Sequence, residues 1–121
     1  MMKFLTLSIV LFSVISCRSI PEEKLNHVVL IWFKAETSEA YIKTVEQESK
    51  ELKKIPGVLD LQLGRAIDSK RKIVDDSFHL GLLFQFNSKS ELDAYIKHPR
   101  HQKFVESYIK GKAKKIVVYD F

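Results

Sequence analysis

Three side chains of this sequence combine acid–base chemistry with positions that let them meet: His27, Tyr95 and His101. An imidazole with a reference pKa of about 6.5 exchanges a proton at neutral pH, and a phenol hydroxyl orients it or holds an enolate oxygen. His101 follows Pro99, which breaks a helix, so the chain can turn His101 back toward Tyr95 and, across a pocket, toward His27. These residues predict either proton transfer or hydrogen bonding to an oxygen of a small molecule.

The same residues also have a structural interpretation without catalysis. His101 can bind a backbone carbonyl group where the helix breaks, Tyr95 can pack with its hydroxyl at the rim, and His27 can open a strand. The sequence favours this interpretation and therefore a binding module over an enzyme, and both alternatives stay open.

Several other chemistries lack the residues that they require. The sequence contains no Gly-rich phosphate loop, nucleophile elbow or Cys/His pair, which argues against nucleotide hydrolysis and acyl-enzyme mechanisms. One Cys and four His cannot make the paired spacing of a structural zinc site. A metal on His27 and His101 would lack a carboxylate at an obvious matching position, so we expect neither a metal nor another cofactor.

The composition fits one soluble domain. The chain has 121 residues and a net charge of +5, with 45% hydrophobic and 29% charged residues. Its lysines alternate with glutamates near residues 46–54 or flank Gly111, as on a solvated helix face and in a connection. Nucleic-acid binding would need basic residues clustered with aromatics on one face, so no nucleic-acid partner is expected.

The N-terminal residues have the layout of an export signal. Met1-Met2-Lys3 precedes an apolar run from Phe4 to Ile15, which is 12 residues long. A membrane-spanning helix needs about 20 apolar residues, and the run has no polar stripe that would suit a buried amphipathic helix. We therefore expect a signal peptide at residues 1–16.

The end of this run, Val14-Ile15-Ser16-Cys17, resembles the lipobox of bacterial lipoproteins. The resemblance implies that Cys17 is lipidated and that residues 17–25 form a lipidated tether. The protein would then be exported and anchored by lipid in the bacterial cell envelope, with a membrane as one partner. The alternative is an ordinary cleavage site with an incidental Cys.

Further along the chain, strand and helix patterns alternate in a definite order. Residues 27–33, 59–64, 78–86 and 116–119 have the pattern of strands. Thr37 or Ser38 begins a helix that ends at Pro56-Gly57, and Ser88 begins another that Pro99 breaks before a second helical piece. This β-α-β-β-α-β order predicts an α+β, ferredoxin-like fold, in which a four-stranded antiparallel sheet carries its helices on one face.

The two faces of this sheet are expected to differ in role. Leu80, Leu82, Phe84 and Phe86 share one parity of their strand and would form an apolar wall on the helix side, beside His27. We expect a small, mostly apolar ligand there. Apolar residues also occupy the opposite face, namely Val28, Leu30, Trp32 and Leu83. A symmetric partner chain would cover them, which predicts a homodimer joined through the sheets.

These residues also resemble a known family, the stress-responsive A/B barrel (Dabb) domain. The matching segments are His27 to Lys34, Ile55-Pro56-Gly57-Val58 through Leu63-Gly64, Asp93 through His101, and Val117 through Asp120. The Tyr-x-x-His-Pro-x-His segment is the most specific of them. The resemblance covers residues 26–121 and implies the dimeric α/β-barrel fold.

One characterised member of the family closes a polyketide chain by aldol chemistry without a metal. Tyr95 and His101 match its catalytic Tyr and His by spacing, and His27 matches a His of its pocket. A further pocket His falls on Leu80, whereas His79 lies one residue away and faces the opposite side of the strand. The resemblance therefore implies, as the alternative function, a cofactor-independent cyclase, aldol-type or proton-transfer enzyme using Tyr95 and His101.

Overall fold

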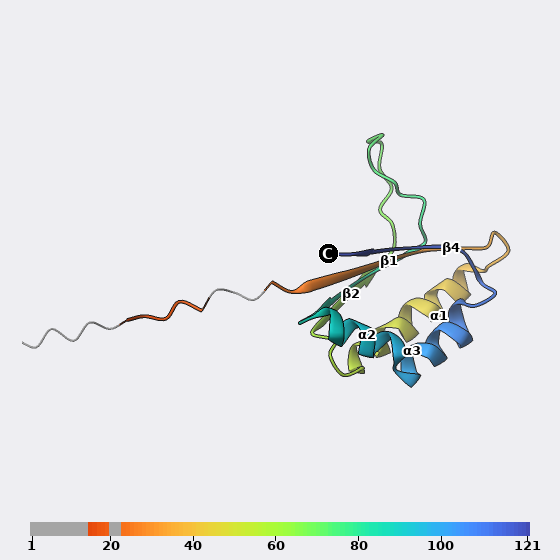
Figure 1. Cartoon of the computed structure of the whole chain (residues 1–121). Helices are drawn as coiled ribbons and strands as arrows, with labels where there is room; N and C mark the ends of the chain where they lie inside the picture. The colour runs from red at the N-terminus through yellow and green to blue at the C-terminus, as the bar shows by residue number, and fades with distance from the viewer. Residues whose placement is uncertain (1–14, 20–22) are drawn as a thin grey trace, which may run out of the picture.

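The computed structural model describes residues 15–19 and 23–121 (Figure 1). The predicted signal peptide lies almost wholly outside these residues, while Cys17 lies inside them and is exposed. Every helix and strand of the described part falls between Leu25 and Asp120. None of its helices has the length and apolar character needed to cross a membrane.

The elements follow the predicted order. The bounds are β1 Leu25–Phe33, α1 Glu39–Ser49, the short helix η1 Lys50–Lys54, β2 Asp60–Gly64, β3 Leu80–Phe86, α2 Lys89–Lys97, α3 Pro99–Phe104, the π-helical turn η2 Val105–Ile109 and β4 Ala113–Asp120. β1 begins two residues before the predicted strand, and β4 begins at Ala113 instead of residue 116. The extra residues of β1 pair with β3, Leu25 opposite Phe86 and Asn26 opposite Gln85. β4 is longer because it pairs with β1 as far as Ala113, which lies opposite Phe33.

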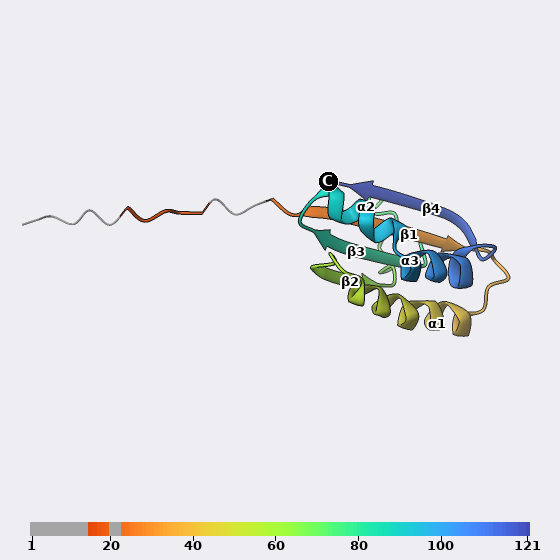
Figure 2. The same cartoon turned by 60° about the horizontal axis from the view of Figure 1, so that its bottom comes forward.

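The four strands form one antiparallel sheet in the order β2-β3-β1-β4. The helices lie on one face of this sheet, as Figures 1 and 2 show from two directions. The predicted α+β, ferredoxin-like architecture is therefore confirmed. β1 is a central strand, so its residues have neighbours on both sides: His27 lies opposite Phe84 of β3 and Asp120 of β4.

Local sequence signals set the helix ends. The Ser38 hydroxyl accepts a hydrogen bond from the Tyr41 backbone N–H at 3.1 Å, and the Ser88 hydroxyl accepts one from Glu91 at 3.2 Å. Each satisfies a donor that the first turn of a helix leaves free. Gly57 has a φ of +93°, a conformation that glycine adopts without strain, and it turns the chain from η1 toward β2.

The hydrophobic core lies between the sheet and the helices. Its buried apolar residues are Ile31, Phe33, Ile42, Val45, Leu52, Ile55, Leu80, Leu82, Phe84, Phe86, Leu92, Tyr95, Phe104 and Ile109. Val28, Leu30 and Trp32 have the opposite parity on β1 and lie, with Leu83, on the face away from the helices, as predicted. All core residues belong to residues 25–121, so this segment contains its own core and should fold by itself.

Candidate ligand-binding site

A cavity of about 290 Å³ lies between the helix side of the sheet and the α2–α3–η2 segment. Its walls are mainly apolar and include Val29, Ile31, Leu82, Phe84, Phe104, Ile116 and Val118. β4 lies at the sheet edge, where no helix covers it (Figure 2). Ile116 and Val118 are consequently 46% and 47% exposed, and the cavity opens along this edge.

The polar groups of the cavity come from four elements. Tyr95 lies on α2, His101 on α3, and His27 and Asp120 lie on the paired strands β1 and β4. The structure therefore brings together the three residues that the sequence singled out, and adds Asp120 to them.

Tyr95 belongs to the hydrophobic core and also lines the cavity. It is only 2% exposed, and its ring centroid lies 5.1 Å from those of both Phe84 and Phe86. Burial raises the pKa of the Tyr95 phenol well above its ordinary value, so the hydroxyl stays protonated and acts as a donor. No residue of the described part hydrogen-bonds this hydroxyl. Every fully buried side-chain polar atom there does have a hydrogen-bond partner, so the Tyr95 hydroxyl is not fully buried. The hydroxyl is therefore reached from the cavity.

His101 is held in place by the helix break. Pro99 starts α3, and the Arg100 N–H donates to His98 Nδ1 at 3.1 Å instead of continuing the α2 helix. The Ile96 carbonyl is thereby left for His101, whose Nδ1 lies 2.9 Å from it. A carbonyl oxygen only accepts, so Nδ1 carries the proton and Nε2 keeps its lone pair. The structural role considered from the sequence is thus present, and it leaves the second ring nitrogen for a ligand.

Burial lowers the pKa of the half-buried His101 imidazole from its ordinary 6.5. The hydrogen bond to Ile96 opposes this shift, and the nearby His27 ring adds to it. The net lowering of the pKa means that His101 is neutral at pH 7, as an acceptor or a general base must be.

His27 is oriented by a carboxylate. Its Nδ1 lies 2.5 Å from an Asp120 carboxylate oxygen, and the His27 residue is 6% exposed while the Asp120 side chain is 45% exposed. The carboxylate accepts from the Nδ1 proton and fixes the ring. Nε2 of His27 is then available, as in His101.

The three rings stand close to one another around the cavity. The centroids of Tyr95 and His101 are 4.8 Å apart, and those of His27 and Tyr95 are 6.2 Å apart. The site therefore offers one hydroxyl donor and two imidazole acceptors within an apolar wall. This set can bind a carbonyl or hydroxyl oxygen, and it can also move a proton.

The predicted wall residues divide into two groups. Leu82 and Phe84 line the cavity, whereas Leu80 and Phe86, at the two ends of β3, do not: both are fully buried in the core. His79 lies at the strand end, outside the cavity, where its Nδ1 accepts from the Phe33 N–H at 2.9 Å. Alternation along β3 predicted the correct face, but it could not show which part of that face the cavity occupies.

Asp120 was not identified from the sequence. The sequence alone shows no carboxylate that could complete a metal site on His27 and His101, yet Asp120 lies beside His27 in the structure. Its position follows from register: β1 and β4 are antiparallel neighbours in this topology, so the start of one meets the end of the other. In the described residues, however, no three His, Cys, Asp or Glu side chains gather as metal ligands would.

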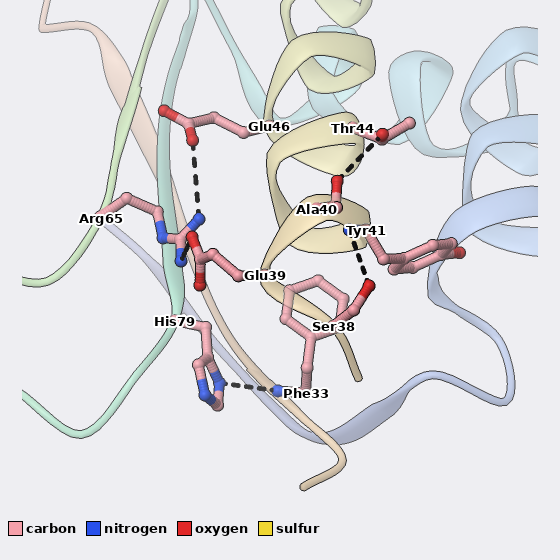
Figure 3. A network of polar contacts seen from close by, with 9 residues as sticks. All are labelled: Phe33, Ser38, Glu39, Ala40, Tyr41, Thr44, Glu46, Arg65 and His79. Atoms are coloured by element: carbon pink, nitrogen blue, oxygen red, sulfur yellow. Dashed lines mark hydrogen bonds and ion pairs between the residues drawn. The ribbon is translucent and has the colours of Figure 1, made fainter. Parts of the chain in front are cut away.

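A second, larger hollow of about 430 Å³ lies beside α1. Arg65 there is 2.6 Å from Glu39 and 3.7 Å from Glu46, while His79 is engaged with Phe33 (Figure 3). Because its principal charges already pair with one another, this hollow is a weaker candidate than the apolar cavity.

The fold is shared with several solved structures. A Dabb family protein of Mesorhizobium loti is 23% identical, covers 81% of this chain and 94% of its own, and has a TM-score of 0.67. Hydroxynitrile lyase from Passiflora edulis is 20% identical over 84% of this chain and 94% of its own, with a TM-score of 0.72. A dimeric ferredoxin-like protein of Jannaschia sp. CCS1 is 25% identical over 82% and 98%, with a TM-score of 0.62.

Comparison with curated protein sequences finds no match. The family model of the stress responsive A/B barrel domain, Dabb, matches residues 25–121. This range contains every strand, every helix and the whole cavity described above. The chain therefore belongs to the Dabb family.

Proposed function

We propose that this protein binds a small, mostly apolar molecule that carries one or two oxygen atoms. One observation carries the proposal: an unpaired Tyr95 hydroxyl and two oriented imidazoles, His27 and His101, face the same apolar cavity. Apolar walls with a few convergent polar groups are typical of ligand sites.

The cavity volume limits the size of the ligand. About 290 Å³ is at the lower end for small-molecule sites, which suits a single aromatic ring or a short alkyl chain. A neutral oxygen fits better than an ion, because Tyr95 supplies a neutral donor and His101 is neutral at pH 7. The proposed ligand class is therefore small ketones, aldehydes, phenols and alcohols.

The test is calorimetric titration of residues 23–121 with benzaldehyde and, as the oxygen-free match, toluene. Benzaldehyde should bind more tightly, and Tyr95→Phe and His101→Ala should each reduce its affinity by roughly 10-fold, the effect of one lost hydrogen bond. His98→Asn is the control, since His98 lies outside the cavity and Asn preserves a helix cap. Equal affinity for benzaldehyde and toluene, unaffected by both variants, would contradict the proposal.

The Asp120–His27 pair favours a second candidate, a proton-transfer or aldol-type enzyme. A carboxylate that fixes an imidazole tautomer is the arrangement expected of a general base. The fold likeness to a hydroxynitrile lyase supplies a test substrate, mandelonitrile. One imidazole would take the hydroxyl proton, the C–C bond to the nitrile would break, and the products would be benzaldehyde and cyanide, which leaves as HCN after protonation.

The two candidates predict different outcomes with mandelonitrile. An enzyme should release benzaldehyde, with turnover lowered roughly 10²-fold or more by His101→Ala or His27→Ala. A binding module should return the hydroxynitrile unchanged at the uncatalysed rate. The His98→Asn variant again provides the control.

We further propose that the chain forms a homodimer through the sheet face opposite the helices. Val28, Leu30, Trp32 and Leu83 lie on this face, and a symmetric copy would remove them from water. The dimeric state of the Jannaschia protein supports the proposal.

A lipid anchor on Cys17 and a location in the bacterial cell envelope complete the proposal. The support is the lipobox-like Val14-Ile15-Ser16-Cys17 and the exposure of Cys17. Two or three acyl chains would anchor the domain stably, whereas one chain gives only marginal membrane binding.

A further inference from the structure

The connection between β2 and β3 has an unusual position. It comprises residues 65–79, here called the arm, and it projects from the sheet face opposite the helices (Figure 1). This is the face on which Val28, Leu30, Trp32 and Leu83 lie. A second copy seated on that face would therefore lie beside the arm.

The arm is braced by its own hydrogen bonds. The Asp76 carboxylate accepts from the Ser69 N–H at 2.8 Å and links the two legs of the arm, that is, the segment leaving β2 and the segment returning to β3. At the tip, the Val74 N–H donates to the Arg71 carbonyl at 3.0 Å and closes a turn. A segment already held in shape loses little conformational entropy when it binds a partner.

The root of the arm is continuous with the apolar sheet face. Trp32 Nε1 donates to the Ser77 hydroxyl at 2.9 Å, and the Phe78 ring meets the Trp32 ring edge-on at 6.3 Å between centroids. Phe78 also covers Gly81, where a Cβ atom would lie 3.2 Å from the ring. In the corner between this root and β4 lies a groove of about 550 Å³ that includes Trp32, Ser77 and Lys115.

Two isoleucines of the arm extend into water. Ile67 on the first leg is 85% exposed, and Ile73 near the tip is 90% exposed. Their neighbours are mostly Lys, Arg, Asp and Ser, so nothing within the arm covers them. Burying either side chain against another surface would lower the free energy.

We propose that the arm clasps a second copy of this chain, with Ile67 and Ile73 packed against the partner seated on the Trp32 face. The inference rests on the sheet-face dimer proposed above. Two-fold symmetry duplicates the contact, so each subunit is held by the other's arm. The corner groove receives side chains of the partner. The arm thereby turns a flat sheet contact into an interlocked one.

Sedimentation equilibrium of residues 23–121 tests the inference. The double variant Ile67→Asp/Ile73→Asp should raise the dimer dissociation constant by roughly 10-fold or more, because each substitution acts twice in the dimer. Leu59→Asp is the matched control: Leu59 is 44% exposed and precedes β2, outside the arm, so the dissociation constant should stay unchanged. Circular dichroism checks folding, and the single Ile67→Ser and Ile73→Ser variants replace the double variant if it unfolds.

The outcomes separate the arm from the dimer. An unchanged dissociation constant for the arm variants, with Trp32→Glu still dissociating the dimer, would overturn the clasp and leave the sheet-face dimer intact. A monomeric wild type would overturn both the clasp and the sheet-face dimer. The ligand-binding proposal would be unaffected, because benzaldehyde binding is measured separately. The basic triplet Lys70-Arg71-Lys72 makes an anionic membrane the alternative binding partner of the arm. Ile73-dependent binding to phosphatidylglycerol vesicles without any effect on dimerisation would overturn the clasp in favour of a membrane contact.

Discussion

Nδ1 of His27 lies 2.5 Å from a carboxylate oxygen of Asp120, although 93 residues separate them in the sequence. The contact exists because β1 and β4 are antiparallel neighbours whose register sets these two residues opposite each other. It makes the last strand part of the candidate site and gives His27 a defined tautomer.

Replacing Asp120 by Ala should lower the free energy of unfolding by about 1 kcal/mol, since the buried His27 Nδ1 loses its partner. Urea unfolding of residues 23–121 measures the change. Asp68→Ala removes an exposed carboxylate and serves as the control. Equal stability of the two variants would show that the Asp120 contact contributes nothing to folding.

Two substitutions of Tyr95 should distinguish its contribution to core packing from its contribution to ligand binding. Tyr95→Phe keeps the ring between Phe84 and Phe86, so the stability should change by less than about 1 kcal/mol while benzaldehyde affinity falls. Tyr95→Ala should cost about 3–5 kcal/mol, because it empties a core position. Denaturant titrations of both variants provide the comparison, and a large stability loss for Tyr95→Phe would mean that the hydroxyl is structural.

The pH dependence of stability should carry a contribution from His101. Its pKa is lowered on folding from the ordinary 6.5, so below pH 6.5 the unfolded chain binds more protons than the folded chain. The contribution is therefore complete above pH 6.5, falls as the pH drops toward the folded pKa, and levels off below it. His101→Gln should flatten this part of the profile in urea titrations between pH 5 and 8, and an identical profile would refute the assignment.

Trp32→Glu should convert the proposed dimer to a monomer. A carboxylate on the apolar face would lie unpaired in the proposed interface, where burying a charge is strongly unfavourable. Sedimentation equilibrium at micromolar concentration is the measurement, and Leu59→Glu supplies the control. A wild-type domain that is already monomeric at this concentration would be incompatible with the prediction.

Cys17→Ala in the full chain should release the protein from membranes of the producing bacterium. The lipobox interpretation predicts that the wild type incorporates radiolabelled palmitate and fractionates with membranes, while the variant does neither. Membrane fractionation of the variant, together with an unlabelled wild type, would disprove the anchor.

Periodicity predicted most of the fold because the residue pattern of each element follows the period of a strand or of a helix. The alternation along β1 put Val28, Leu30 and Trp32 on one face and His27 on the other, and the structure agrees. Pro99 correctly marked the helix break that turns His101 back to Ile96. These features depend on local residues alone.

The remaining features depend on how distant elements meet. Asp120 joins the site through strand register, and Leu80 lies outside the cavity because core packing fully buries it at the start of β3. The exposure of the two isoleucines in the arm likewise depends on the direction in which this loop leaves the sheet. No local pattern in the chain encodes these relationships.

Trp32 is the only tryptophan of the chain, and it lies on the sheet face opposite the cavity with the Lys115 ammonium 4.7 Å from its ring centroid. Its fluorescence therefore reports on whatever covers that face, since emission shifts to the blue when an indole leaves water. Because the sheet lies between Trp32 and the cavity, assembly on the Trp32 face can be followed by the intrinsic fluorescence of an unlabelled sample, separately from ligand binding in the cavity.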